Sequence, residues 1–220
     1  MDLRMDIVVE YFPYFMQGMG LTILMSVVGG VLMGCILGFF IALGKMSSIF
    51  IVRLPFVWYI NFLRGTPLLV QLFLFHYAVL PTVLGSTTAI TSVMVTLSLN
   101  SSAYVAEIFR AGLQSIDKGQ AEAAHSLGMN KFQVMRHVLL PQAFKRSIPP
   151  LGNEFIVLLK DSSLGAMIAA QEILYWGGRA AAGQYLRVWE PYIMVALMYL
   201  VLTLSLTYLL NYLERRLDVK

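Results

Sequence analysis

The composition of this chain excludes a soluble globular domain. Its 220 residues are 58% hydrophobic and only 13% charged, against about 45–50% apolar and about 25% charged residues in an average soluble domain. Disordered and collagen-like classes are excluded by the same figures. The net charge of +4 is a topology signal in a membrane protein, so we expect no nucleic-acid partner. The single cysteine excludes an intrachain disulfide framework.

Five stretches are long and apolar enough to cross a bilayer as helices, which takes about 20 residues each. We therefore expect an all-α polytopic membrane protein with spans at about 11–43, 52–80, 86–111, 144–170 and 191–213. The second span contains Arg64 and is closed by Pro81. The first is too long to be the apolar part of a cleaved signal peptide, so we expect it to be retained.

Basic residues are distributed unequally between the two sides that five spans define. Eleven lie in the segments of one side: Lys45, Arg53, Arg110, Lys118, Lys131, Arg136, Lys145, Arg146, Arg215, Arg216 and Lys220. The other side holds only Arg4, Arg179 and Arg187. Because cytoplasmic segments carry the excess of Lys and Arg, we expect the N-terminus outside, residues 1–17 as an external segment, and residues 215–220 as a cytoplasmic tail.

Small residues recur every four positions in the first span. They are Ser26, Gly30, Gly34, Gly38 and Ala42. This spacing places them on one helix face, where small side chains let two helices approach closely. The pattern predicts a tightly packed seam but does not say which helix is the partner.

The longest segment between spans, residues 112–143, is predicted to form two short cytoplasmic helices. Asp117 and Asn130 are each followed three residues later by glutamine, which is the pattern of a capped helix start. Gly128 suits the left-handed position that ends the first helix, and Pro141 is expected to end the second. The second helix carries an apolar stripe of Phe132, Met135, Val138 and Leu139.

Several motifs resemble those of a known family. Within this loop, Glu122-Ala123-Ala124 followed by Gly128, Val138, Leu140 and Pro141 resembles the EAA loop of ABC importer permeases, with Val138 where isoleucine is usual. Residues 64–71, residues 159–164 and the set Ala103, Tyr104, Glu107 and Arg110 resemble the polar amino acid branch of that family, the histidine, glutamine and arginine type permeases.

The resemblance implies a type I importer fold over residues 18–214 and a permease subunit of an ATP-driven importer of polar amino acids in a prokaryotic cytoplasmic membrane. It implies two ATP-binding cassette ATPases, a second identical or homologous permease and an extracytoplasmic binding protein as partners, besides membrane lipid. ATP and Mg would bind the ATPases, with no cofactor on this chain. The residues implied in ATPase coupling are Glu122, Ala123, Ala124, Gly128, Phe132, Met135, Val138 and Pro141. The external segment 171–190 is the expected docking surface for the binding protein.

Ionisable residues inside a span are costly and usually face a partner or a water-filled path. An amino acid carries a carboxylate and an ammonium, so its path needs groups of both signs or amides. The candidates are Asn100, Ser101, Glu107, Asp161, Lys160 and Arg64. Straight spans would put Arg64, Asn100, Lys160 and Asp161 within about 6 Å of the midplane. Alternatively, Lys160 with Asp161, or Arg64 with Glu107, forms pairs that hold the bundle together.

Other residues are candidates for a hinge or gate. They are Gly65, Thr66 and Pro67, which interrupt the second span, and Glu154. Irregular backbone at membrane depth occurs where it faces protein or a cavity.

No metal set, nucleophile motif or phosphate-binding loop is present in the sequence, so we do not expect an enzyme. The main alternative is an ion-gradient-driven secondary transporter or channel subunit, and a scaffold subunit without a path is another. Secondary transporters often contain an inverted repeat, which this sequence lacks.

Overall fold

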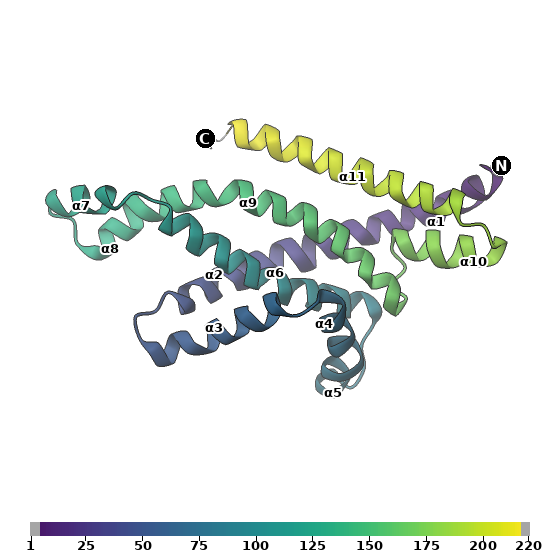
Figure 1. The fold of residues 1–220 in the computed structure, drawn as a ribbon, viewed down its shortest axis with the longest axis horizontal. Coiled ribbons are helices and arrows are strands. Elements are labelled where there is room, and N and C mark those ends of the chain that lie inside the picture. Colours follow the sequence, from purple (N-terminus) through teal and green to yellow (C-terminus); the bar gives the residue numbers. More distant parts are fainter. Residues whose placement is uncertain (1–4, 217–220) are drawn as a thin grey trace.

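Residues 5–216 are described by the computed structural model shown in Figure 1, and all regular structure in this range is helical. The N-terminal half consists of α1 (Met5–Leu24), the π-helical stretch η1 (Met25–Met33), α2 (Gly34–Lys45), α3 (Phe50–Gly65), α4 (Leu68–Leu74), η2 (Phe75–Val79), α5 (Leu80–Leu84) and α6 (Ala89–Gln114). The C-terminal half consists of α7 (Lys118–Ser126), α8 (Lys131–Val134), η3 (Met135–Leu139), α9 (Leu140–Asp161), η4 (Ser162–Ile168), η5 (Tyr175–Ala181), α10 (Ala182–Tyr185) and α11 (Trp189–Arg216).

Three helices among the described residues are long and apolar enough to cross a membrane: Asp6–Lys45, Ala89–Gln114 and Trp189–Arg216. A fourth is obtained if α3 and the helix Leu68–Leu84 count as one span. The predicted fourth span lies mainly on α9, whose charged side chains keep it out of this set. The total of five spans and their orientation therefore stay predictions.

The second span was predicted to be straight, but it is bent. The helices before and after Gly65–Pro67 are bent by 110°, and Figure 1 shows α4 and α5 running across the long axis that α1, α6 and α9 follow. The straight-span assumption behind the depth predicted for Arg64 is therefore wrong, and the depth itself stays a prediction. Thr66 and Pro67 have extended backbone at this point, as expected for proline and the residue before it.

Two prolines predicted to end helices do not do so. Pro81 and Pro141 lie in the first turn of α5 and α9, and each follows a π-helical turn, η2 or η3. Each proline continues a helical run, so a carbonyl in the preceding turn loses its usual N–H donor, and the π-helical turn just before the proline is the local irregularity that accommodates this loss. Residues 131–161 consequently form one helical run without a loop. After Pro81 the helix continues to Leu84 and ends at Gly85, which has a φ of 76°.

The seam of small residues is present, and its partners are α6 and α9. A Cβ atom added to Gly34 would lie 2.6 Å from Ser101 Oγ, and one added to Gly38 would lie 2.6 Å from Val105 Cγ1. At Gly30 the nearest atom would be Leu158 Cδ1, at 2.9 Å. Helix α6, which is buried along much of its length, thus sits against α2 at backbone distance.

The predicted external segment 1–17 is not a separate element where it is described. Residues 5–17 are helical and continuous with the first span, and their apolar side chains Ile7, Tyr11 and Phe15 pack against Ile173 and Val195. Residues 1–4, and residues 217–220 of the predicted tail, lie outside the described residues.

The segment before η5 is fixed by the carboxylate of Glu172, which is completely buried. It accepts hydrogen bonds from the backbone N–H groups of Leu174 at 2.8 Å and Tyr175 at 2.7 Å and from the Tyr199 hydroxyl at 2.6 Å. Burial raises the pKa of Glu172, although these three donors favour the charged form. The contact to Tyr199 ties this segment to α11.

Candidate functional site

The break between α3 and α4 is held by two buried amides. Gln71 Nε2 donates to the Leu63 carbonyl at 2.7 Å and to the Thr66 hydroxyl at 2.8 Å. Asn100 Nδ2 donates to the same carbonyl at 3.3 Å and to Gln71 Oε1 at 2.9 Å. Backbone carbonyls freed at the end of a helix need such partners when they are buried. The donors of Asn100, a path candidate, are thus directed at the break.

A second path candidate, Ser101, faces the seam. Its side chain is completely buried, its Oγ has no hydrogen-bond partner among the described residues, and it lies beneath Gly34 of α2. Ser101 therefore contributes to helix packing at this position and does not meet the charged candidates.

Glu107 is surrounded by basic side chains from three helices. It forms an ion pair with Lys45 at the end of α2 and accepts from Arg110 Nη2 at 2.8 Å on its own helix. Arg64, in the last turn of α3, lies 3.7 Å away. The side chain of Glu107 is 15% exposed, so these contacts are partly shielded from water. The predicted pair of Arg64 and Glu107 is confirmed, and Lys45 joins it.

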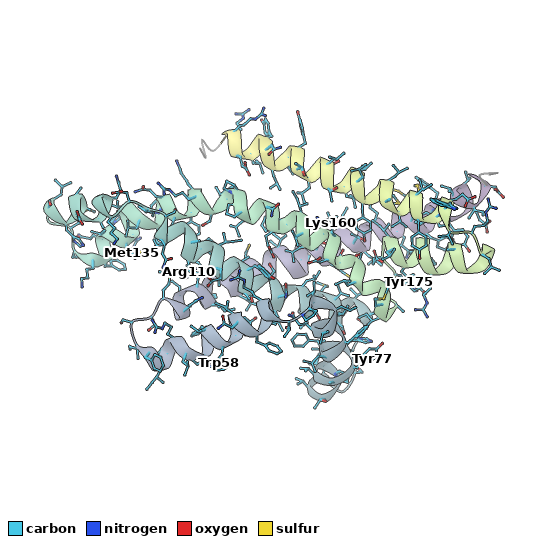
Figure 2. All side chains as sticks on the ribbon, in the orientation of Figure 1. Trp58, Tyr77, Arg110, Met135, Lys160 and Tyr175 are labelled. Atoms are coloured by element: carbon cyan, nitrogen blue, oxygen red, sulfur yellow. The ribbon has the colours of Figure 1, made fainter. Side chains whose placement is uncertain are left out.

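A groove of about 550 Å³ opens beside this cluster. Arg64 lies over the Tyr104 ring, with 5.1 Å from Cζ to the ring centroid; such stacking holds the guanidinium while leaving its N–H groups available. Other polar lining residues are Glu107, Arg110, Ser115 and Arg146. Figure 2 labels Arg110, Lys160 and Tyr175 in that order along the long axis, which places the groove toward the end that carries α7 and α8.

The remaining charged candidates lie on α9. Glu154 and Asp161 are two helical turns apart, and each is partly exposed. Lys160 is exposed. No ion pair within residues 5–216 joins Lys160 to Asp161, so the alternative that these two form a structural pair is not supported.

The two-helix segment has the predicted caps, with one change. Asn130 and Gln133 form the expected reciprocal capping box. Asp117 caps α7 through Gly119 N at 2.7 Å rather than through residue 120. Gly128 has a φ of 83°, which is the left-handed position that favours glycine. Ala124 and Val134 are buried and join the two helices.

The apolar stripe predicted on this segment divides into two parts. Phe132 points outward and is 69% exposed. Met135 instead lines an apolar cavity of about 140 Å³, together with Leu140, Phe39, Phe109 and Phe144. Val138 is partly buried, whereas Glu122 and Ala123 are exposed. The outward apolar surface is completed by Leu127, which is 83% exposed.

Three residues that matter here were missed as functional candidates. Gln71 is a single amide in the apolar run 68–75, which is a usable signal for a buried polar contact. Leu127 directly precedes Gly128 and is not part of the apolar stripe predicted on the second helix. Glu172 gave no signal of burial, because its side-chain partner Tyr199 is 27 positions away in sequence.

The long apolar helices are those of an integral membrane protein, and the comparison with protein families gives its class. The family described as "Binding-protein-dependent transport system inner membrane component" matches residues 30–219. The chain belongs to this family, and it is therefore a membrane transport subunit and not an enzyme.

Individual relatives are similar to this chain over nearly its whole length. The chain is 39% identical to the "Probable amino-acid ABC transporter permease protein YckA" of Bacillus subtilis, covering 94% of this chain and 91% of that protein. It is 36% identical to the "Glutamine transport system permease protein GlnP" of Escherichia coli K12, covering 94% of each. The predicted resemblance to the amino acid permeases of ABC importers is confirmed.

Solved structures give the same fold. A chain of the "Crystal structure of an amino acid ABC transporter with histidines" superposes with a TM-score of 0.91 at 42% identity and covers 98% of this chain and 100% of that one. A MetNI methionine ABC transporter in an inward-facing conformation superposes with a TM-score of 0.81 at 18% identity, covering 94% of this chain and 98% of that one. The second comparison supports the fold alone.

Proposed function

We propose that this chain is the permease subunit of an ATP-driven importer of polar amino acids in a prokaryotic cytoplasmic membrane. The observation that carries the proposal is the match, over nine tenths of both chains, to proteins named as amino acid permeases. Some of those names specify glutamine or arginine, which supports a polar amino acid as the substrate.

The path is proposed to run along the charged groove at the face of α3, α6 and α9. Groups of both signs meet there, since Arg64 and Arg110 both lie close to Glu107. A zwitterionic amino acid needs such a mixture. In a single chain Arg64 and Lys160 are exposed, and charges are costly where they face lipid. A second permease facing this surface would enclose them, which supports a dimer. The bend at Gly65–Pro67 is the proposed hinge, and Glu154 is the proposed gating residue.

Coupling to the ATPases is proposed to use the two-helix segment. Leu127 and Phe132 form an apolar surface on either side of the Gly128 turn, which suits insertion into a groove of another protein. ATP and Mg would bind that partner, and movement of its subunits would be carried into α6 and α9. The external segment 171–190 is proposed to dock the binding protein.

Reconstitution tests the proposed function. The permease is assembled in vesicles with the cognate ATPase and binding protein, and uptake of labelled glutamine, arginine and histidine is followed. We expect uptake of at least one polar amino acid only with ATP, and no ATP hydrolysis by the permease alone. Uptake that persists without ATP and collapses with the ion gradient would identify a secondary transporter and overturn the proposal.

Within the same assay, Asp161→Asn tests the path. Removing a partly exposed carboxylate that has no ion pair among residues 5–216 leaves the fold intact, but takes away one of the groups able to meet the substrate ammonium. We expect KM to rise by about tenfold, equivalent to about 1.4 kcal/mol, with basal ATP hydrolysis unchanged. Glu214→Gln, on α11 and away from the groove, is the control. Equal KM values in Asp161→Asn and wild type would exclude Asp161 from the path.

A further inference from the structure

A second groove, which shares Arg110 with the groove of the proposed path, lies at the turn between α2 and α3. Its volume is about 500 Å³, within the range of about 300–1,000 Å³ that is usual for small-molecule sites. It is bounded by the end of α2, the first turns of α3 and the last turn of α6. Its polar lining consists of Lys45, Ser47, Arg53, Arg110 and Gln114.

The lining of this groove is positively charged. Three of its side chains are cationic and none is acidic. Glu107 lies behind them and pairs with Lys45 and Arg110, so it neutralises only part of their charge. Arg53 is exposed and has no acidic partner within residues 5–216. Its guanidinium lies 5.9 Å from the centroid of the Phe50 ring. This arrangement favours an oxyanion.

The depth of the groove points to a membrane ligand. Two of the candidate spans, Asp6–Lys45 and Ala89–Gln114, end at it. Because the ends of spans lie toward the membrane surface, we infer that the groove lies near the lipid headgroups. Large apolar side chains project beside it. Ile49, Phe50 and Ile51 are exposed, Ile51 to 80%. A water-soluble phosphate has no apolar part that could contact these side chains, whereas the acyl chains of a phospholipid can pack against them.

We propose that this groove binds an anionic phospholipid, with the headgroup phosphate among Lys45, Arg53 and Arg110 and the acyl chains along Ile49–Ile51. Arg53 is the specificity-determining residue, because it is the cation of the three that is not committed to Glu107. The lipid phosphate and Glu107 then share Lys45 and Arg110. A bound lipid would therefore compete with Glu107 for these two cations, which belong to the ion cluster beside the proposed path.

Native mass spectrometry of the purified assembled transporter tests the proposal. Phosphatidylglycerol and phosphatidylcholine with identical acyl chains serve as probes. Wild type is expected to retain phosphatidylglycerol in preference. Arg53→Gln is expected to reduce that retention by about fivefold, the effect of one basic residue at an anionic surface. Arg53→Lys should retain most of it, and Arg215→Gln, an exposed basic residue at the end of α11, should match wild type.

Three results would overturn the proposal. Equal retention of the two lipids would show that no anionic headgroup is recognised. Equal losses of phosphatidylglycerol retention in Arg53→Gln and Arg215→Gln would show that the lipid is attracted by the overall positive charge and not by this groove. Inorganic phosphate that displaces the lipid from wild type, and itself binds in an Arg53-dependent manner without lipid, would show a site for a free oxyanion.

Discussion

The double substitution Leu127→Glu and Phe132→Glu is expected to abolish ATP-dependent uptake while leaving the permease folded. Both side chains are largely exposed, so neither contributes to the internal packing of the segment. If they enter a groove of the ATPase, each is an apolar anchor worth about 2 kcal/mol, and a buried carboxylate without a partner adds a further cost. We expect association with the ATPase to weaken by a factor on the order of 10² to 10³. Copurification and uptake measure this effect.

The control for this experiment is His137→Glu. It introduces the same carboxylate on the same segment, at an exposed position outside the apolar pair. Its uptake should remain close to that of wild type. Equal loss of copurifying ATPase from His137→Glu and from the double variant would show that the coupling surface is misassigned. Full uptake by the double variant, with an unchanged thermal midpoint, would show the same.

Replacing Gly38 by leucine is expected to prevent stable assembly of the bundle. The Cβ atom alone would lie 2.6 Å from Val105 Cγ1 and 2.9 Å from the Ser102 carbonyl oxygen. The Ser102 oxygen is a backbone atom of a helix, so it cannot move aside without moving the helix. Helices α2 and α6 must separate to admit a side chain there. Overpacking of this kind costs about 1–3 kcal/mol or more. Yield of folded protein and thermal midpoint in detergent should both fall.

Gly20 offers a matched control in the same continuous helix. A Cβ atom added at Gly20 meets nothing within 4 Å, so Gly20→Leu makes an identical chemical change without the collision. Its thermal midpoint should equal that of wild type. Equal midpoints for Gly38→Leu and Gly20→Leu would contradict close packing at the seam.

Local sequence patterns predicted the features that depend on short spacing. The repeat of small residues predicted a seam, and the patterns at Asn130 and Gly128 predicted a cap and a left-handed turn, as found. Each is determined by residues within a few positions of one another. The partner of the seam was not predictable, because any other span satisfied the pattern equally well.

Features that depend on distant residues were predicted poorly. The sequence indicated a break at Gly65–Pro67, but the bend of 110° is held by Asn100, which bonds to Gln71 29 positions away. Pro141 was misassigned because a π-helical turn before it lets the helix continue. Arg64 and Glu107 were considered as a pair, whereas Lys45, 62 positions from Glu107, was not.

The absence of a loop between residues 131 and 161 has a mechanical consequence. Phe132 at the proposed ATPase surface and Asp161 at the proposed path lie on the same hydrogen-bonded helical run, separated by 29 residues, or about 44 Å of helix at 1.5 Å per residue. A force applied at one end is transmitted through backbone hydrogen bonds rather than dissipated in flexible chain. The run is one continuous helix from the proposed ATPase surface to the proposed path, so a movement of one end displaces the other.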